Sequence, residues 1–251
     1  MPRPWIVRPR PSPAARLRIY CFPYAGGGAS AFRTWPDDLP PEVEVCAVQL
    51  PGRESRFREA AFSDLRATAA AASEVLSPTL AEPFALFGHS LGSWLAFEFA
   101  RSLAAMGRVP AHLFVSGRRG PRLPERFPPL HTLPDQEFVE GINSRYGGMA
   151  PEVLQNRELL KLLLPSLRAD VRAVETYTYV PAPKLECPIS VFGGASDAFS
   201  NHDELEGWRV ETSGPTSLDI LPGGHFFIQT QQARLLDLVG ERLLRVLPAR
   251  G

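Results

Sequence analysis

Short apolar runs alternate along the chain with longer stretches that repeat with helical periodicity. The runs are rich in valine, isoleucine, leucine and phenylalanine and alternate little with polar residues, which is typical of strands covered on both faces. Helical periodicity predicts helices over 65–75, 91–106 and 231–246. The predicted strands span 17–22, 44–50, 84–88, 113–116, 189–192 and 218–221, with a further short strand around Trp5 to Val7.

This alternation of strands and helices indicates the α/β class, with a mainly parallel central sheet flanked by helices on both faces. A chain of 251 residues, 44% of them hydrophobic, is long enough to bury one large core. We therefore expect a single domain over residues 1–251.

One connection is much longer than the others. The segment 118–187 separates two predicted strands, whereas such loops usually have only a few residues. It begins rich in proline and arginine and then becomes rich in leucines that nearly encircle a helix, so more than one helix face should be covered. We expect a helical lid insertion over about 118–187 at the C-terminal edge of the sheet, in which Pro165 should break or kink the helix. The alternative is a rigid additional layer.

Charge and hydropathy argue against several classes of protein. The 27 Lys and Arg residues balance 27 Asp and Glu residues, which disfavours a general nucleic-acid-binding protein or a polybasic membrane protein. Mean hydropathy is −0.10, and no apolar run reaches the roughly 20 residues that span a bilayer. The first ten residues contain no apolar h-region, so we expect no secretory signal.

The cysteines and the first arginines carry less information. Cys21, Cys46 and Cys187 are few and odd in number, so we expect buried strand residues in a reducing cytoplasm, and neither a disulfide framework nor a metal cluster. The first 18 residues contain five arginines and no acid. Two interpretations stay open for this segment, a solvated leader and a basic arm that contacts an acidic partner.

The strongest local signal is Gly88-His89-Ser90-Leu91-Gly92, which matches the pattern G-x-S-x-G. A predicted strand runs into it and a predicted helix leaves it, which is the context of a nucleophile elbow. The glycines would avoid clashes in a sharp turn, so that Ser90 projects above the sheet and the N–H of Leu91 faces the same space. The alternative role of Ser90 is an ordinary helix N-cap.

A serine hydroxyl needs a general base near neutral pH. His225 follows the last predicted strand in the loop LPGGHFF, where two glycines would present it at the C-terminal edge of the sheet. We expect His225 to be the base; the alternative is a packed loop histidine. The side chain of His89 should point away from Ser90. The other histidines are less well placed: His112, His131 and His202.

The base needs an acid that orients it. Asp197 follows a predicted strand and the turn Gly193-Gly194-Ala195-Ser196, so it should reach the same sheet edge one strand before His225. Asp203 is the second choice, and Asp219 lies inside a predicted strand and fits poorly. The chain order Ser, Asp, His is that of the α/β hydrolases.

An oxyanion needs a second donor besides the N–H of Leu91. The first long strand ends in Cys21-Phe22-Pro23-Tyr24-Ala25-Gly26-Gly27-Gly28, and we expect the N–H of Ala25 to face the site. The same glycines also fit a dinucleotide fingerprint, but Pro36 would shorten the helix that must follow, and no acid for a ribose ends the next strand. We find no metal-ligand spacing.

Together these segments resemble the type II, stand-alone thioesterases of polyketide and nonribosomal peptide synthases. The resemblance covers nearly the whole chain and rests on CFPYAGGGAS, VQLPGRESR, FGHSLGSWLAFEFAR, VFGGASD and LPGGHFF, in the family's order and spacing. It implies an α/β-hydrolase core with a helical lid. It also implies Ser90 as nucleophile, Asp197 as acid, His225 as base, and the amides of Ala25 and Leu91 as the oxyanion hole.

The resemblance further implies hydrolysis of acyl thioesters from the phosphopantetheine arm of carrier proteins, to remove wrong or stalled acyl groups from a synthase. It implies no cofactor or metal, acyl or peptidyl carrier domains as partners, no nucleic acid or membrane partner, and a monomer. The alternatives are an acyltransferase that loads a carrier protein, a general esterase of the same fold, and a non-catalytic binding protein. Arg53 and Arg56 are expected either on a solvated surface or against an acidic carrier protein.

Overall fold

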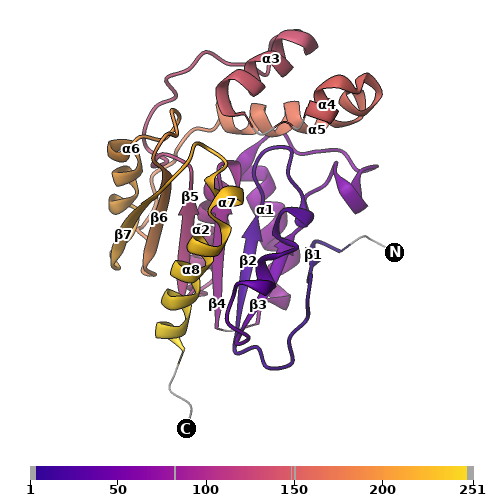
Figure 1. The fold of residues 1–251 in the computed structure, drawn as a ribbon. Coiled ribbons are helices and arrows are strands. Elements are labelled where there is room, and N and C mark those ends of the chain that lie inside the picture. Colours follow the sequence, from indigo (N-terminus) through magenta and orange to yellow (C-terminus); the bar gives the residue numbers. More distant parts are fainter. Residues whose placement is uncertain (1–3, 82, 148, 150, 248–251) are drawn as a thin grey trace.

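The structure is a computed structural model that describes residues 4–81, 83–147, 149 and 151–247. Its centre is a seven-stranded sheet in the order β1-β3-β2-β4-β5-β6-β7, in which only β1 is antiparallel to its neighbour (Figure 1). The strands are β1 Ile6–Val7, β2 Leu17–Phe22, β3 Val43–Val48, β4 Phe84–His89, β5 His112–Ser116, β6 Ile189–Gly194 and β7 Thr216–Leu221. The helices are α1 Leu65–Leu76, α2 Leu91–Ala104, α3 Asp135–Tyr146, α4 Pro151–Gln155, α5 Arg157–Glu175, α6 His202–Glu206, α7 Phe227–Thr230 and α8 Gln232–Val246.

Helices cover both faces of the sheet. In β2, Tyr20 and Phe22 belong to the core that packs against α1 and α2, whereas Ile19 and Cys21 belong to the core that packs against α8. Figure 1 shows α8 in front of the sheet with α1 and α2 behind it. Because successive side chains of a strand point to opposite faces, a strand covered on both sides must be apolar throughout. This is why the buried strands read as continuous apolar runs.

The α/β class predicted from the sequence is confirmed, and the predicted strands and helices are present. Strand 17–22 coincides with β2, and most other boundaries differ by one or two residues. The helix predicted over 91–106 ends at Ala104, and the one predicted over 231–246 begins at Gln232. The division into a single domain with an insertion stays a prediction.

The chain between β5 and β6 contains α3, α4 and α5, which lie beyond the upper ends of the strands in Figure 1. The expected break at Pro165 is wrong, because α5 continues through it; the alternative of a kink stays a prediction. The expectation that several faces of this helix are covered is also wrong for Leu162 and Leu163, which are 53% and 36% exposed. A small core of its own begins at Leu164, together with residues of α3.

Over residues 4–18, the arginine-rich start matches the expected solvated segment with one short strand, and Arg3 lies outside the described residues. Strand β1 pairs with β3 at the sheet edge. Arg18 donates to Glu44 at 2.6 Å, and Arg10 pairs with Asp37 at 2.5 Å. These arginines are partly neutralised by acids of the same chain, which weakens the case for a basic docking arm.

Two further sequence expectations concern buried side chains and the membrane. Cys21 and Cys46 are buried in β2 and β3, and Cys187 is buried just before β6; all are free thiols. Burial raises the pKa of Cys46 and of Cys187 to about 12, so neither is a reactive thiolate. Within the described ranges, no helix is long and apolar enough to cross a bilayer.

Candidate active site

The turn between β4 and α2 places Ser90 at the head of α2 with φ 54° and ψ −116°, a conformation that residues other than glycine rarely adopt. A Cβ atom on Gly88 would overlap the carbonyl oxygen of Gly92, and one on Gly92 would overlap that of Phe22. The two glycines are therefore required by close backbone contact. The N-cap alternative for Ser90 is wrong, because its side chain makes no capping hydrogen bond.

The side chains of Ser90, His225 and Asp197 lie in one hydrogen-bonded row. His225 Nε2 is 2.9 Å from Ser90 Oγ, and His225 Nδ1 is 2.8 Å from Asp197 Oδ2. A carboxylate beside Nδ1 keeps the proton on that nitrogen, which leaves Nε2 to accept the Ser90 hydroxyl. All three residues are more than 90% buried, with exposures of 8%, 6% and 7%. The geometry is that of a nucleophile, its base and an orienting acid.

Asp197 is held as an anion by several donors. Burial raises the pKa of its carboxyl, but the hydrogen bond and charge of His225 outweigh burial, so the pKa lies below its ordinary 3.8. The backbone N–H of Phe199 donates to Oδ1 at 2.9 Å, and the Ser200 hydroxyl donates to Oδ2 at 2.8 Å. Asp197 is thus ionised throughout the neutral range.

Two strand ends meet so that Asp197 and His225 face each other. Gly223, with φ 111°, follows β7, and its carbonyl oxygen accepts from the N–H of Ser196 at 2.8 Å. A Cβ on Gly194 would overlap the backbone of Gly223 and Gly224. The glycines of both loops therefore permit the close approach that joins the acid to the base.

The remaining histidines and acids lie in other environments. His89 is buried with Nδ1 2.9 Å from Ser116 Oγ, and burial lowers its pKa well below 6.5. His131 lies 2.6 Å from Glu175. Asp203 is exposed in α6, and Asp219 lies inside β7, where Arg242 donates to it. Among the described histidines and acids, the base and acid predicted from the sequence are the pair that meets Ser90.

The loop after β2, residues 24–30, lies on one side of Ser90, and we call it the glycine loop. Within the described part of the chain, the N–H groups of Ala25 and Leu91 have no hydrogen-bond acceptor. The N–H of Gly27 donates to the carbonyl oxygen of Tyr24 at 2.9 Å. A dinucleotide fingerprint needs a helix after the glycines, but the chain forms only a short 3-10 turn from Ala29 to Phe32. The two free amides are consistent with an oxyanion hole and the loop is inconsistent with dinucleotide binding.

A buried ion pair fixes the glycine loop. Arg53 donates two hydrogen bonds to Asp170 of α5, at 2.6 and 2.7 Å, and one to the carbonyl oxygen of Gly27 at 3.1 Å. Asp170 Oδ2 also accepts the N–H of Gly26 at 2.7 Å. Both side chains are about 95% buried, so the expectation of a solvated or docking Arg53 is wrong.

The same correction applies to Arg56, which is 5% exposed and pairs with Glu59. The sequence contains a signal for Arg53, because it lies in the segment VQLPGRESR that carries the resemblance. It contains no signal for the partner, since Asp170 is 117 positions away.

A cavity of about 510 Å³ opens over Ser90 between the sheet and the helices α3 and α5. This volume is within the range of small-molecule sites. Apolar residues of α5 and the glycine loop line much of it, together with His225, Tyr146 and Arg118. Sequence reasoning did not single out Tyr146 or Arg118. In the described ranges, no group of three or more His, Cys, Asp and Glu side chains is arranged to hold a metal ion.

Comparison with known proteins gives consistent matches. A family model of the thioesterase domain matches residues 17–243. The gramicidin S biosynthesis protein GrsT of Aneurinibacillus migulanus is 41% identical over 245 residues, covering 97% of this chain and 95% of that protein. Thioesterase PikA5 of Streptomyces venezuelae is 40% identical, covering 96% and 85%. The solved structure of the type II thioesterase BorB from the borrelidin biosynthetic cluster has a TM-score of 0.88 at 38% identity, covering 95% and 97%.

Proposed function

The chain belongs to the thioesterase domain family and is a thioesterase of the α/β-hydrolase fold, and on that premise we propose that it hydrolyses acyl thioesters from the phosphopantetheine arm of carrier proteins. Its role would be to remove wrong or stalled acyl groups from a polyketide or nonribosomal peptide synthase that makes an antibiotic-like product. Two relatives support this proposal: GrsT is named a gramicidin S biosynthesis protein, and BorB is named a type II thioesterase from the borrelidin biosynthetic cluster.

The observation that carries the proposal is the 2.9 Å contact between His225 Nε2 and Ser90 Oγ at the floor of the cavity. We assign Ser90 as nucleophile, His225 as general base and Asp197 as the acid that orients His225. The N–H groups of Ala25 and Leu91 would hold the oxyanion. Losing one such donor typically costs about 2.7–4 kcal/mol of transition-state stabilisation.

The chemistry proceeds in two balanced steps. Ser90 Oγ forms a bond to the thioester carbonyl carbon while His225 takes its proton. The C–S bond then breaks, and the thiolate takes that proton from His225 to leave as a thiol. A thiol has a pKa of about 8.5, so its departure needs little assistance. Water then attacks the acyl-serine while His225 takes a proton from it. His225 returns this proton to Ser90 Oγ as the C–O bond to Ser90 breaks, which releases the free acid and restores the enzyme.

The other activities that the sequence left open are less well supported. An acyltransferase would use a second thiol in place of water, and a general esterase would prefer oxygen esters. The matched relatives include a protein named a thioesterase and another named a type II thioesterase, which favours hydrolysis of thioesters. A non-catalytic binding protein would not need a base hydrogen-bonded to the serine.

The insertion over about 118–187 is proposed to act as a lid on a single domain, 1–251. Its apolar side chains Leu164, Leu167 and Val171 line the cavity over Ser90 and would keep bulk water from the acyl-enzyme. We also propose that the enzyme is monomeric, uses no cofactor of its own, and works in the cytoplasm on acyl or peptidyl carrier domains, without nucleic acid or membrane.

A paired hydrolysis assay tests this function. The same acyl group is presented on a carrier protein and on pantetheine, with Ser90→Ala as the blank, and the free acid is measured. We expect a higher kcat/KM on the carrier because a protein surface contributes binding. Equal or better hydrolysis on pantetheine would overturn the carrier-protein claim and leave a small-molecule thioesterase.

A further inference from the structure

The segment after β5 forms one wall of the cavity, and this wall contains a buried cation with unsatisfied donors. Arg118 is 3% exposed and lines the cavity that also contacts Ser90 and His225. Within the described residues, its Nε and Nη2 atoms have no hydrogen-bond partner. An unpaired buried donor of a charged group costs stability, so such a group needs a reason. We call this region, with Trp94 and Tyr146, the Arg118 wall.

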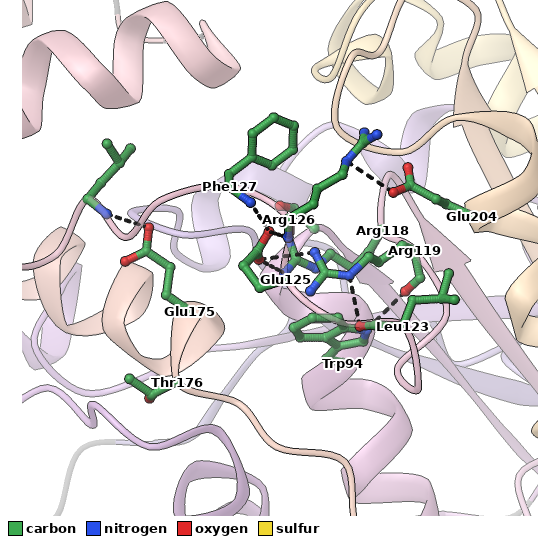
Figure 2. A network of polar contacts seen from close by, with 12 residues as sticks. Trp94, Arg118, Arg119, Leu123, Glu125, Arg126, Phe127, Glu175, Thr176 and Glu204 are labelled. Atoms are coloured by element: carbon green, nitrogen blue, oxygen red, sulfur yellow. Dashed lines mark hydrogen bonds and ion pairs between the residues drawn. The ribbon is translucent and has the colours of Figure 1, made fainter.

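The adjacent arginine shows how a purely structural guanidinium is arranged here. Arg119 Nε donates to the carbonyl oxygen of Leu123 at 3.2 Å, and Nη1 donates to Glu125 at 3.0 Å (Figure 2). Arg119 is 4% exposed, so burial is the same as for Arg118. The difference between the two residues is therefore hydrogen bonding and not depth.

Charge is also unbalanced at this wall. Among the described residues, the carboxylate that pairs with these arginines is that of Glu125. It is bonded to Arg119 and lies 3.6 Å from Arg118 Nη2, which is too far for a hydrogen bond. Two buried guanidinium groups thus share a single negative charge. Arg118 makes no hydrogen bond to that carboxylate and lines the cavity, where an acceptor atom of a ligand could complete its hydrogen bonding.

The geometry holds the Arg118 guanidinium in place. Its Cζ lies 3.8 Å from the centroid of the Trp94 ring, and the Trp94 Nε1 donates to the carbonyl oxygen of Arg119 at 3.1 Å. A guanidinium stacked on an indole keeps its N–H edge free for a planar acceptor. Such rigidity reduces the entropy lost when an acceptor binds.

Arg118 lies close to the reacting atoms. It follows β5 by two residues, and the last residue of β5, Ser116, accepts the N–H of Ser90 at 2.8 Å. Tyr146 lines the same wall with its ring 5.2 Å from the His225 ring. Because Ser90, Arg118 and Tyr146 line the same cavity, an acyl chain attached at Ser90 shares that space with the guanidinium and the phenol.

We infer that Arg118 is a specificity residue that favours acyl groups carrying an oxygen acceptor, either a keto or hydroxyl oxygen or a carboxylate, over plain alkyl chains. This inference rests on the proposed function, since it names a substrate class for the same site. A charged hydrogen bond to a substrate oxygen corresponds to roughly 10- to 100-fold in kcat/KM.

The test compares three pantetheine thioesters of similar size: butyryl, 3-oxobutyryl and malonyl. The measured quantity is the ratio of kcat/KM for each oxygenated acyl group to that for butyryl, in wild type, Arg118→Gln and Arg118→Lys. We expect the ratio for at least one oxygenated group to fall about 10- to 100-fold in Arg118→Gln and less in Arg118→Lys. Loss on 3-oxobutyryl identifies a neutral oxygen, and loss on malonyl identifies a carboxylate.

Arg126→Gln is the matched control, since Arg126 belongs to the same loop but is 41% exposed and pairs with Glu204. Its ratios should equal those of wild type. Melting temperature is the second readout: removing an unsatisfied buried cation should leave it unchanged or raise it. Unchanged ratios in Arg118→Gln, or a large fall in melting temperature with unchanged ratios, would overturn the inference and make Arg118 structural.

Binding to the Ser90→Ala protein separates this inference from the proposed function. Calorimetry measures the affinity of this protein for butyryl-, 3-oxobutyryl- and malonyl-pantetheine, and it needs no turnover. A preference for an oxygenated thioester that disappears in Ser90→Ala/Arg118→Gln supports the Arg118 site even where carrier-protein hydrolysis fails. Equal binding of all thioesters to both proteins contradicts it.

Discussion

The two walls of the cavity treat buried polar groups in opposite ways. In the glycine loop, the N–H of Gly26 donates to Asp170, and the carbonyl oxygen of Gly27 accepts from Arg53. The N–H of Ala29 donates to the side-chain oxygen of Gln49 at 3.2 Å. At the Arg118 wall, a guanidinium of similar burial has donors without a partner among the described residues.

The difference separates two uses of polar groups at one site. A group whose hydrogen bonds are complete within the protein can fix geometry but has nothing left for a ligand. A group left incomplete destabilises the folded protein and is available to a substrate, which is the exchange of stability for function seen at many active sites. Under the proposed function, the glycine loop would serve the transition state of any acyl group, and the Arg118 wall would distinguish one acyl group from another.

The largest effect is expected from removing the Ser90 hydroxyl, which lies in the cavity between the two walls. Ser90→Ala should lower kcat by about 10⁴- to 10⁶-fold for every thioester, because no acyl-enzyme can form. Turnover is measured by release of free thiol, with circular dichroism to confirm the fold. Ser102→Ala, which removes a hydroxyl bonded within the same helix α2, should retain wild-type turnover. Substantial hydrolysis by Ser90→Ala would mean that neither wall faces the reacting group.

The next effect tests the satisfied wall. Asp170→Asn leaves the buried charge of Arg53 unpaired and leaves one side-chain oxygen where Arg53 and Gly26 used two, so the amide of Ala25 should shift. We expect kcat to fall by about 10- to 100-fold for butyryl and oxygenated thioesters alike, with little change in KM. Stability should fall by about 3 kcal/mol, measured by urea unfolding.

Glu211→Gln provides the control for this prediction. Glu211 is a buried acid, 3% exposed on its side chain, that accepts from Arg122 at 2.7 Å and lies before the opposite, N-terminal end of β7. The Glu211→Gln variant should lose stability without a comparable loss of kcat. Equal loss of kcat in both variants would assign the effect of Asp170→Asn to general destabilisation, and unequal loss between butyryl and oxygenated substrates would merge the roles of the two walls.

The smallest effect concerns His112, a buried side chain with incomplete hydrogen bonding outside the cavity. His112 begins β5 at the end of the strand away from Arg118; its Nε2 is 2.8 Å from Ser190 Oγ, and its Nδ1 has no partner within the described chain. Burial, followed by the charge of Arg242, lowers the pKa of His112 from 6.5 to about 4.

Below pH 6.5 the unfolded chain binds this proton and the folded protein does not, so the folded protein loses stability as pH falls towards about 4. Between pH 7 and pH 5 the loss from His112 should be about 2 kcal/mol. Urea unfolding of His112→Gln should therefore be less sensitive to pH in this range by that amount, with activity ratios unchanged. An identical pH dependence in both proteins would show that burial does not set the charge of His112.

For a clear physical reason, the sequence predicts the sheet, its flanking helices and the meeting of Ser90, His225 and Asp197. Strands buried on both faces must be apolar, and parallel strands bring all their C-terminal loops to one edge. A nucleophile, acid and base in such loops therefore come together whatever lies between them. Their catalytic roles stay predictions that substitution must test.

What the sequence does not predict depends on contacts within the insertion. Nothing local marks Asp170 as the partner of Arg53, and a surface arginine has the same sequence appearance as a buried one. Pro165 lies within α5 because packing after Leu164 stabilises the helix beyond what proline costs. The two leucines before it are exposed, so periodicity alone overestimates burial there.

The order of the functional groups along the chain has a consequence for protein synthesis. Ser90 precedes His225 by 135 positions. At bacterial or eukaryotic translation rates the interval is on the order of ten seconds. During that time a nascent polypeptide carries the serine and its elbow without a base, so a stalled or truncated translation product has no hydrolytic power. With the proposed roles of Ser90 and His225, hydrolysis can thus begin only after the segment that carries His225 has been made.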